Sequence, residues 1–332
     1  MKIIFFLSLL LYVSLFAQQG KLKESYDNGA LKKIENYQSG KLDGVCRYYT
    51  SEGVIKEVLN YENGKLNGEC YYYYESGVLK EKITFLNDKY NGEYLAFYPT
   101  GNLKEKGTYS DGVTDGSFKG FFDSGELLST STFKNAKKQG IVSEYYKNGK
   151  LKAEAYYEDD LQNGITKWYY EDGSLKGEWN FRQGNLHGEG REFTAEGVPV
   201  YIKNYAYGKL DGLVTLFSEN GNIKSESNYS QGMRFGITRS FYDNGTPWTE
   251  QNYDKDKING ETKIFRKNGS LWYIETYANG EIISTKEFSE SGEIIKEEIL
   301  KKINWLCRNH KLLLVRRTFE KYFFLLILSS NA

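Results

Sequence analysis

The sequence has few of the residues that metal centres and disulfide scaffolds need. Its 332 residues include three cysteines and two histidines. This leaves few soft ligands for a zinc site and too little cysteine for a disulfide framework. Three prolines stand against 34 glycines, which excludes proline-rich linkers and collagen. We expect no cofactor and no metal.

An excess of charge of either sign is also missing. Lys and Arg total 44, as do Asp and Glu, so no global basic field exists to gather phosphates, and we expect no nucleic-acid partner. With 39% hydrophobic and 16% aromatic residues, the chain has ample material for a folded core.

Residues 1–17 have the layout of a secretory signal peptide. Lys2 precedes an apolar run from Ile3 to Phe16, followed by Ala17, after which we expect cleavage. The run is shorter than the roughly 20 residues that span a bilayer. The sequence therefore predicts export to a periplasmic, cell-envelope or extracellular location.

The last segment, residues 300–332, is basic and unlike the rest. Residues 301–332 hold seven basic residues against one acidic residue, a net charge of +6, and lack Gly and Pro. Apolar residues recur there at helical spacing, which predicts a short amphipathic helix. Two roles stay open: a cap over the last strand, or contact with an anionic membrane or a partner.

Residues 18–299 are a repeat array with a period of 24 residues. One glycine column is Gly44, Gly68, Gly92, Gly116, Gly140, Gly164, Gly188, Gly212, Gly236 and Gly260, and a second runs every 24 residues from Gly29 to Gly269. Aromatic columns include Tyr49 and Tyr61, and an aliphatic column includes Ile55. The residues expected to define the repeat are Gly44, Tyr49, Gly53, Ile55, Tyr61, Gly68, Tyr73 and Gly77.

Each repeat is predicted to be one β-hairpin. Segments of about six residues, such as Val45 to Thr50, are too short for helices and rich in aromatic and β-branched residues. Asn-Gly, Asp-Gly and Ser-Gly pairs separate them and supply the positive φ of tight turns. We expect an all-β, elongated, single-layer antiparallel sheet of about ten hairpins, roughly 95 Å long at about 4.8 Å per strand.

The hairpin loop sets the register. A two-residue turn at 52 and 53 would pair Tyr49 with Lys56, whereas a three-residue loop ending in Gly53, with a G1 bulge, pairs Tyr49 with Ile55. We prefer the second register because it is expected to place Tyr49, Ile55 and Tyr61 on one face, where the sheet can exclude water.

The repeat resembles a known family. The segment Gly184-Asn185-Leu186-His187-Gly188-Glu189-Gly190 is similar to the centre of MORN repeats, and Gly40-Lys41-Leu42-Asp43-Gly44 to their bacterial form. The whole unit resembles the MORN-repeat variant of YwqK-like antitoxin components. The resemblance implies a sheet of hairpins used for protein association, links to membranes in some members, and toxin neutralisation in this branch.

Catalytic chemistry finds no support in the repeats. His187 occupies a column of turn residues that includes Asp43 and Asn67, and the segment from Asp254 to Gly260 lacks the spacing of a calcium loop. Cys46 and Cys70 hold equivalent positions two strands apart, roughly 9.5 Å, too far for a disulfide. We expect a non-enzymatic protein.

Recognition is expected to use positions that vary between copies, because variation permits a different contact at each step. The candidate partner-binding residues are Arg47, Tyr48, Tyr71, Tyr72, Lys167, Trp168, Arg191 and Arg239. The preferred hypothesis is an exported scaffold that binds a protein, such as a toxin. An envelope- or membrane-associated structural protein, contacting the membrane through its tail, is the alternative.

Overall fold

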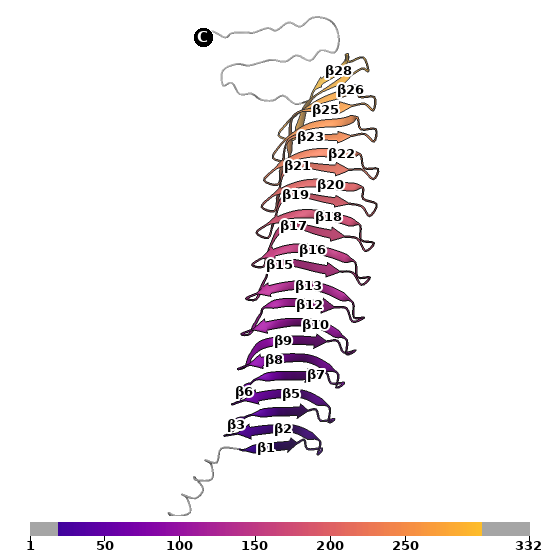
Figure 1. The fold of residues 1–332 in the computed structure, drawn as a ribbon. Helices are drawn as coiled ribbons and strands as arrows, with labels where there is room; N and C mark the ends of the chain where they lie inside the picture. Colours follow the sequence, from indigo (N-terminus) through magenta and orange to yellow (C-terminus); the bar gives the residue numbers. More distant parts are fainter. Residues whose placement is uncertain (1–18, 301–332) are drawn as a thin grey trace, which may run out of the picture.

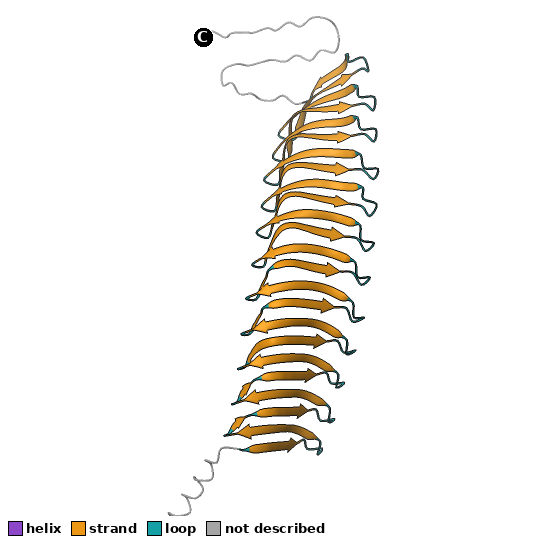
Figure 2. Cartoon of the chain, viewed as in Figure 1, coloured by secondary structure: helices purple, strands orange, loops and turns teal. Residues whose placement is uncertain are grey.

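A computed structural model describes residues 19–300. These residues form a 28-stranded antiparallel sheet one layer thick, with no helix in this range (Figures 1 and 2). The strands stack as rungs from β1 at one end to β28 at the other (Figure 1). The predicted fold class is therefore confirmed for the array, whereas the predicted signal peptide and helical tail lie outside the described residues.

Twelve hairpins make up residues 19–300, two more than the approximate number expected. Their first strands are β1 (Gly20–Ser25), β4 (Gly44–Tyr49), β7 (Gly68–Tyr73), β9 (Lys89–Phe97), β12 (Gly116–Phe121), β15 (Gly140–Tyr145), β17 (Leu161–Tyr169), β19 (Asn185–Phe193), β21 (Lys209–Phe217), β23 (Met233–Phe241), β25 (Lys257–Phe265) and β27 (Glu281–Phe288). Their second strands are β2 (Leu31–Gln38), β5 (Ile55–Glu62), β8 (Leu79–Leu86), β10 (Leu103–Ser110), β13 (Leu127–Lys134), β16 (Leu151–Glu158), β18 (Leu175–Arg182), β20 (Pro199–Ala206), β22 (Ile223–Ser230), β24 (Pro247–Asp254), β26 (Leu271–Ala278) and β28 (Ile294–Ile299). Two-residue strands precede some first strands: β3 (Lys41–Leu42), β6 (Lys65–Leu66), β11 (Val113–Thr114) and β14 (Lys137–Lys138).

The loop inside each hairpin has the predicted form. The Thr50 amide donates to the Val54 carbonyl at 2.8 Å, and the Gly53 amide donates to the Thr50 carbonyl at 3.0 Å. Gly53 has a φ of 85°, the left-handed conformation that a G1 bulge requires of its last loop residue. Tyr49 accordingly pairs with Ile55, as the preferred register predicts.

The prediction that Tyr49, Ile55 and Tyr61 lie on one face is wrong. The next pair after Tyr49 and Ile55 is Tyr48 with Glu57, so an extra residue, Lys56, bulges from the second strand. Because side chains alternate along a strand, the bulge places Ile55 and Tyr61 on opposite faces. Tyr61 lies opposite Gly44, and therefore on the face that carries Cys46 and Tyr48.

One face of the sheet, which we call the core face, carries the buried side chains. A hydrophobic cluster forms there around Leu59, Cys70, Ile83 and Phe85, with tyrosines packed against it. The most buried column is that of Cys46, which includes Cys70, Phe118, Thr166, Val214 and Thr262. We call the other face, which carries Val45, Arg47, Val58 and Asn60, the exposed face.

No second layer lies over the core face in residues 19–300, and aromatic rings cover it instead. Tyr90, Tyr109, Phe118 and Phe133 contact one another edge to face, with centroids 5.2 to 5.6 Å apart along the chain of rings. Such contacts are favourable beyond the area they bury. The ring of Phe118 lies directly over Gly107, where a Cβ would overlap it.

Tyrosine hydroxyls tie consecutive hairpins together. The Tyr26 hydroxyl donates to the Tyr49 carbonyl at 2.7 Å, and Tyr74 donates to the Phe97 carbonyl at 2.8 Å. The same bond recurs from Tyr98, Tyr146, Tyr170 and Tyr242, one repeat to the next. Near the C-terminal end of the sheet, the Arg266 guanidinium replaces the hydroxyl and donates to the Phe288 carbonyl.

The contact between Gly107 and Phe118 yields a test of core-face packing. We expect Gly107→Ala to lower the free energy of unfolding by about 1–3 kcal/mol, because the added methyl displaces a buried ring. Urea denaturation measures the change. In a Phe118→Leu background, which removes the ring, the same substitution should cost clearly less. Equal losses in both backgrounds would contradict the packing described.

Candidate functional site

The eight candidate partner-binding residues do not form one surface. Arg47, Tyr71, Lys167, Arg191 and Arg239 share the exposed face, whereas Tyr48, Tyr72 and Trp168 lie on the core face because they are the next residues along their strands. Tyr48 and Tyr72 are packed against the hydrophobic cluster. Trp168 is 40% exposed.

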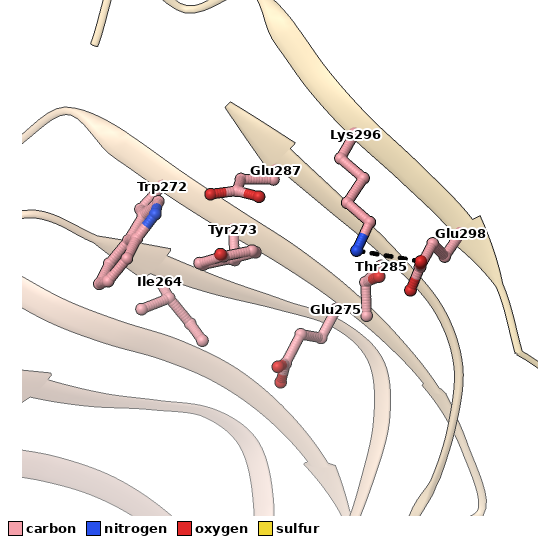
Figure 3. A pocket seen from close by; sticks show the side chains of 8 residues that line it. All are labelled: Ile264, Trp272, Tyr273, Glu275, Thr285, Glu287, Lys296 and Glu298. Atoms are coloured by element: carbon pink, nitrogen blue, oxygen red, sulfur yellow. Dashed lines mark ion pairs between the residues drawn. The ribbon is translucent and has the colours of Figure 1, made fainter. Parts of the chain in front are cut away.

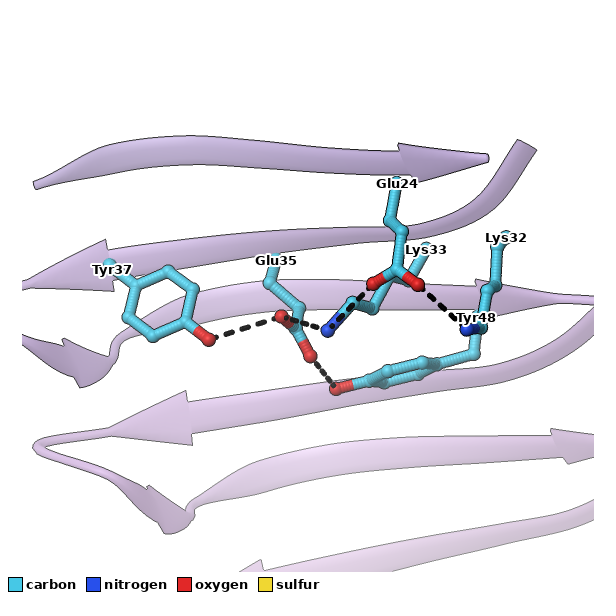
Figure 4. A network of polar contacts seen from close by, with 6 residues as sticks. All are labelled: Glu24, Lys32, Lys33, Glu35, Tyr37 and Tyr48. Atoms are coloured by element: carbon cyan, nitrogen blue, oxygen red, sulfur yellow. Dashed lines mark hydrogen bonds and ion pairs between the residues drawn. The ribbon is translucent and has the colours of Figure 1, made fainter. Parts of the chain in front are cut away.

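Tyr48 is held in a polar network at the N-terminal end of the core face (Figure 4). The Glu35 carboxylate accepts hydrogen bonds from the Lys33 ammonium at 2.9 Å, from Tyr48 at 3.0 Å and from Tyr37 at 3.1 Å. Glu24 bridges Lys32 and Lys33 beside them (Figure 4). Tyr48 is therefore a structural residue.

The network determines the charge state of Glu35. Burial acts to raise the pKa of this carboxyl, but the hydrogen bonds from Lys33, Tyr48 and Tyr37 outweigh it and hold the pKa below its ordinary value. Burial also raises the pKa of Tyr48, with its bond to Glu35 acting in the same direction. The carboxylate and the neutral phenol are thus the stable forms at neutral pH.

The middle of the exposed face carries a row of charged residues whose sign alternates between directly paired strands, with Ile202, Thr215 and Ile274 interrupting the row. Along it, Glu154 pairs with Lys167, Lys167 with Glu178, and Glu178 with Arg191. Farther on, the Arg239 guanidinium lies 3.0 Å from Glu250, which also lies 4.0 Å from Lys263. We call this row the charge ladder; its members are Glu154, Lys167, Glu178, Arg191, Glu226, Arg239, Glu250, Lys263, Lys286 and Glu297.

Beside the charge ladder lies a row of exposed apolar side chains that the sequence analysis missed. Ile141 is 56% exposed and pairs with Tyr156, which is 45% exposed. Ile165 is 51% exposed, and Leu213 and Ile237 follow at equivalent positions, 40% and 41% exposed. Glutamate or serine fills this column in other copies, such as Glu69 and Ser117. This contrast between copies is the sequence feature that could have identified the exposed apolar row.

These residues define the candidate site. We call it the binding face; it comprises Ile141, Tyr156, Ile165, Leu213 and Ile237 together with Lys167, Arg191 and Arg239. Ile141 and Ile165 lie two strands, about 9.5 Å, apart, as do Leu213 and Ile237, and Glu189 occupies the same column between the two pairs. An extended apolar row flanked by charges suits a protein partner better than a small molecule, which requires a concave pocket.

An open hollow of about 420 Å³ lies at the C-terminal end of the sheet (Figure 3). It is lined by Ile264, Trp272, Tyr273, Glu275, Thr285, Glu287, Lys296 and Glu298. Hydrogen bonding to Glu287 raises the pKa of Tyr273, and Glu298 raises the pKa of Lys296. Another, about 350 Å³, lies among polar loop residues near Asp43.

Histidine and cysteine lie apart in the described residues. The His187 ring contacts the Tyr207 ring at a tilt of 60°, with centroids 5.0 Å apart. Cys46 and Cys70 are free, fully buried thiols. No group of three or more potential metal ligands occurs among residues 19–300, and no helix in that range is long and apolar enough to cross a membrane.

The hairpin array and its 24-residue period match a known repeat. The profile of the MORN repeat variant matches ten segments that together cover more than half of the chain. The chain belongs to the MORN repeat variant family. The matched segments are 18–39, 42–65, 66–87, 90–111, 114–135, 138–159, 162–183, 210–231, 236–255 and 258–279. Residues 184–209 are unmatched, although β19 and β20 continue the MORN array there.

Other comparisons add little. No curated protein matches the sequence. Among solved structures, the crystal structure of TcdB2-TccC3 is 13% identical, with a TM-score of 0.20, over 84% of this chain and 18% of that one. That of TcdB2-TccC3-Cdc42 is 12% identical, with a TM-score of 0.17, over 85% and 19%. This chain thus spans less than a fifth of either chain.

The Glu35 network yields a pH test. Because its folded pKa lies below the unfolded one, Glu35 stabilises the fold above its ordinary pKa, and this contribution is lost as the pH falls through the folded value. We expect Glu35→Gln to unfold more readily at pH 7 and to lose less stability than the wild type on acidification. Glutamine occupies the equivalent position at Gln251, so the substitution fits sterically. Parallel pH profiles of the two proteins in thermal melts would contradict this account.

Proposed function

We propose that this MORN-repeat chain is a non-enzymatic, exported scaffold that binds another protein through the binding face. The observation that carries the proposal is the group of four exposed apolar side chains in one column of the sheet: Ile141 and Ile165 in successive repeats, and Leu213 and Ile237 in successive repeats after Glu189. Exposed apolar patches of this kind mark interaction surfaces. Repeat scaffolds present such surfaces along their length.

The electrostatics of the same face favour protein over nucleic acid. The charge ladder alternates in sign, so Lys167, Arg191 and Arg239 each stand beside a glutamate. Alternating charges create no extended positive field for a phosphate backbone. They do supply a pattern that a complementary protein surface can match, which contributes specificity and association rate.

The resemblance to YwqK-like components suggests the class of partner. Within this proposal the partner is an exported toxin, and binding neutralises it in the manner of an immunity protein. We infer from the expected signal peptide of residues 1–17 that the two proteins meet outside the cytoplasm, in the periplasm, the envelope or the extracellular space.

Substitution of the exposed isoleucines tests the proposal. We expect Ile141→Ser, Ile165→Ser and Ile237→Ser, combined, to weaken partner capture from the exported fraction by at least about tenfold, because central apolar contacts supply most binding energy. Stability should change little, since the side chains are exposed and Ser117 occupies the same column. Quantitative mass spectrometry of affinity-captured material measures the change.

A matched control removes apolar area elsewhere. Leu86, Val113 and Leu161 are 47%, 39% and 48% exposed and lie at inter-hairpin turns, at the margin of the exposed face and outside the residues that define the binding face. Their combined replacement by serine should leave capture unchanged. Equal loss in both triple variants, or recovery of the chain only from the cytoplasmic fraction, would refute the proposal.

A further inference from the structure

The first and last strands of the sheet each have one unpaired edge. β1 pairs with β2, and β28 pairs with β27. Within residues 19–300, no strand pairs with the other edge of either. All six residues of β28 are exposed, as are five of the six in β1. An unpaired edge presents a row of free amide and carbonyl groups that can accept another strand.

The two free edges belong to opposite halves of the repeat, so that one can continue from the other. β1 is the first strand of a hairpin and β28 is the second strand of one. Inside the array, each second strand pairs with the first strand of the following repeat, as β8 does with β9. β28 therefore lacks the kind of strand that β1 of another copy provides.

The array fixes the register that such a junction would have. The pair Phe288 and Ile294 in the last hairpin, and the pair Ser25 and Leu31 in the first, both correspond to Tyr73 and Leu79 in the third. These equivalences align Lys296 and Glu297 of β28 with Glu81 and Lys82 of β8. They align Glu24 and Lys23 of β1 with Ala96 and Leu95 of β9.

In the register of β8 and β9, Glu81 pairs with Ala96, Lys82 with Leu95, and Ile83 with Tyr94. The same pairing between two copies places Lys296 opposite Glu24 and Glu297 opposite Lys23. Opposite charges thus face each other at two successive positions, one on each face of the sheet. Directly opposed charges of opposite sign stabilise antiparallel pairs.

The junction also continues the alternation of charge on both faces. On the exposed face, Lys286 forms an ion pair with Glu297 at 3.2 Å, and Lys23 of the second copy would come next. On the core face, Glu287 pairs with Lys296 (Figure 3), and Glu24 of the second copy would come next. Glu24 itself lies 3.4 Å from Lys33, the next charge in the row.

Other registers fit less well. A slip of two residues in one direction places Glu298 opposite Glu24, a repulsive pair. A slip of two in the other direction keeps one attractive pair, Glu297 with Lys21, and places Lys296 opposite Leu22. A slip of one residue would exchange the two faces of the incoming sheet. The register of the array is thus the one that the charges favour.

We propose that copies of this protein associate head to tail, with β1 of one copy adding to β28 of another so that the sheet continues. Each junction leaves a free β28 at one end and a free β1 at the other. Such a heterologous contact does not close on itself in a straight array, and therefore grows into filaments.

Reversal of one charge at each edge tests the proposal. Lys23→Glu sets two carboxylates against each other at the junction, and Glu297→Lys sets two ammonium groups against each other. Sedimentation velocity of the purified protein at rising concentration should show that the wild type forms growing oligomers, which high salt weakens. Each single variant should associate about tenfold more weakly, because a favourable pair becomes a repulsive one.

Mixing the two variants provides the decisive comparison. In an equimolar mixture, the carboxylate introduced at position 23 of one variant faces the ammonium introduced at position 297 of the other. At the next junction the unchanged Lys23 faces the unchanged Glu297, so the growing oligomers should return. Lys224→Glu is the matched control, since it makes the same change of net charge on β22, which lies inside the array and away from both free edges, and the variant should associate like the wild type. Circular dichroism verifies that each variant is folded.

Several outcomes would overturn the proposal. A wild type that stays monomeric at every concentration would mean that another segment, such as residues 301–332, covers β28. A dimer that grows no further would indicate a symmetric contact between identical ends. A mixture that associates no better than its components, or a Lys224→Glu variant as impaired as Lys23→Glu, would exclude the proposed junction.

Discussion

The structure depends on a sheet that has no second layer to cover it. Each side chain on the core face can be buried only by its neighbours along the ladder of strands. Large rings solve this problem, since Phe118 spans from its own strand to Gly107 and contacts Tyr109 and Phe133. The strict 24-residue period follows, because an insertion would shift a ring away from the strand that it covers.

Two irregularities in each repeat adapt the hairpin to this task. The loop ending at Gly53 closes the hairpin with a G1 bulge, and the bulge at Lys56 then switches the alternation of the second strand. Leu59 and Tyr61 consequently face the same side as Cys46 and Tyr48. The exposed face is left free to vary, and there the copies differ in charge and in exposed apolar residues.

Much of this architecture could be predicted from the sequence. The spacing of the glycines indicates hairpins, and an aromatic residue before the loop with an aliphatic residue after it favours the pairing of Tyr49 with Ile55. The bulge at Lys56 could not be predicted, because no residue type marks it: its column holds lysine in some copies and Trp248 or Trp272 in others. Missing this bulge led to the wrong face for Tyr61.

The candidate site could be predicted only in part, because the register determines on which face a varying residue lies. Variation between copies selected Lys167, Arg191 and Arg239, which the structure places on the exposed face. It also selected Tyr48 and Tyr72, which the structure places on the core face, packed against the hydrophobic cluster. The Cys46 column could not be predicted as part of the core, because small, β-branched and aromatic residues all occupy it. What unites them is burial, which only the register determines.

Thiol labelling of the native protein tests the assignment of the two faces most directly. Cys46 and Cys70 are fully buried, and burial raises the pKa of both thiols. Both should therefore react with a maleimide only after unfolding, whereas a cysteine introduced by Ile141→Cys on the exposed face should react at once. Mass spectrometry of the labelled peptides identifies each site. Rapid labelling of Cys46 or Cys70 in the folded protein, or protection at position 141, would contradict the account.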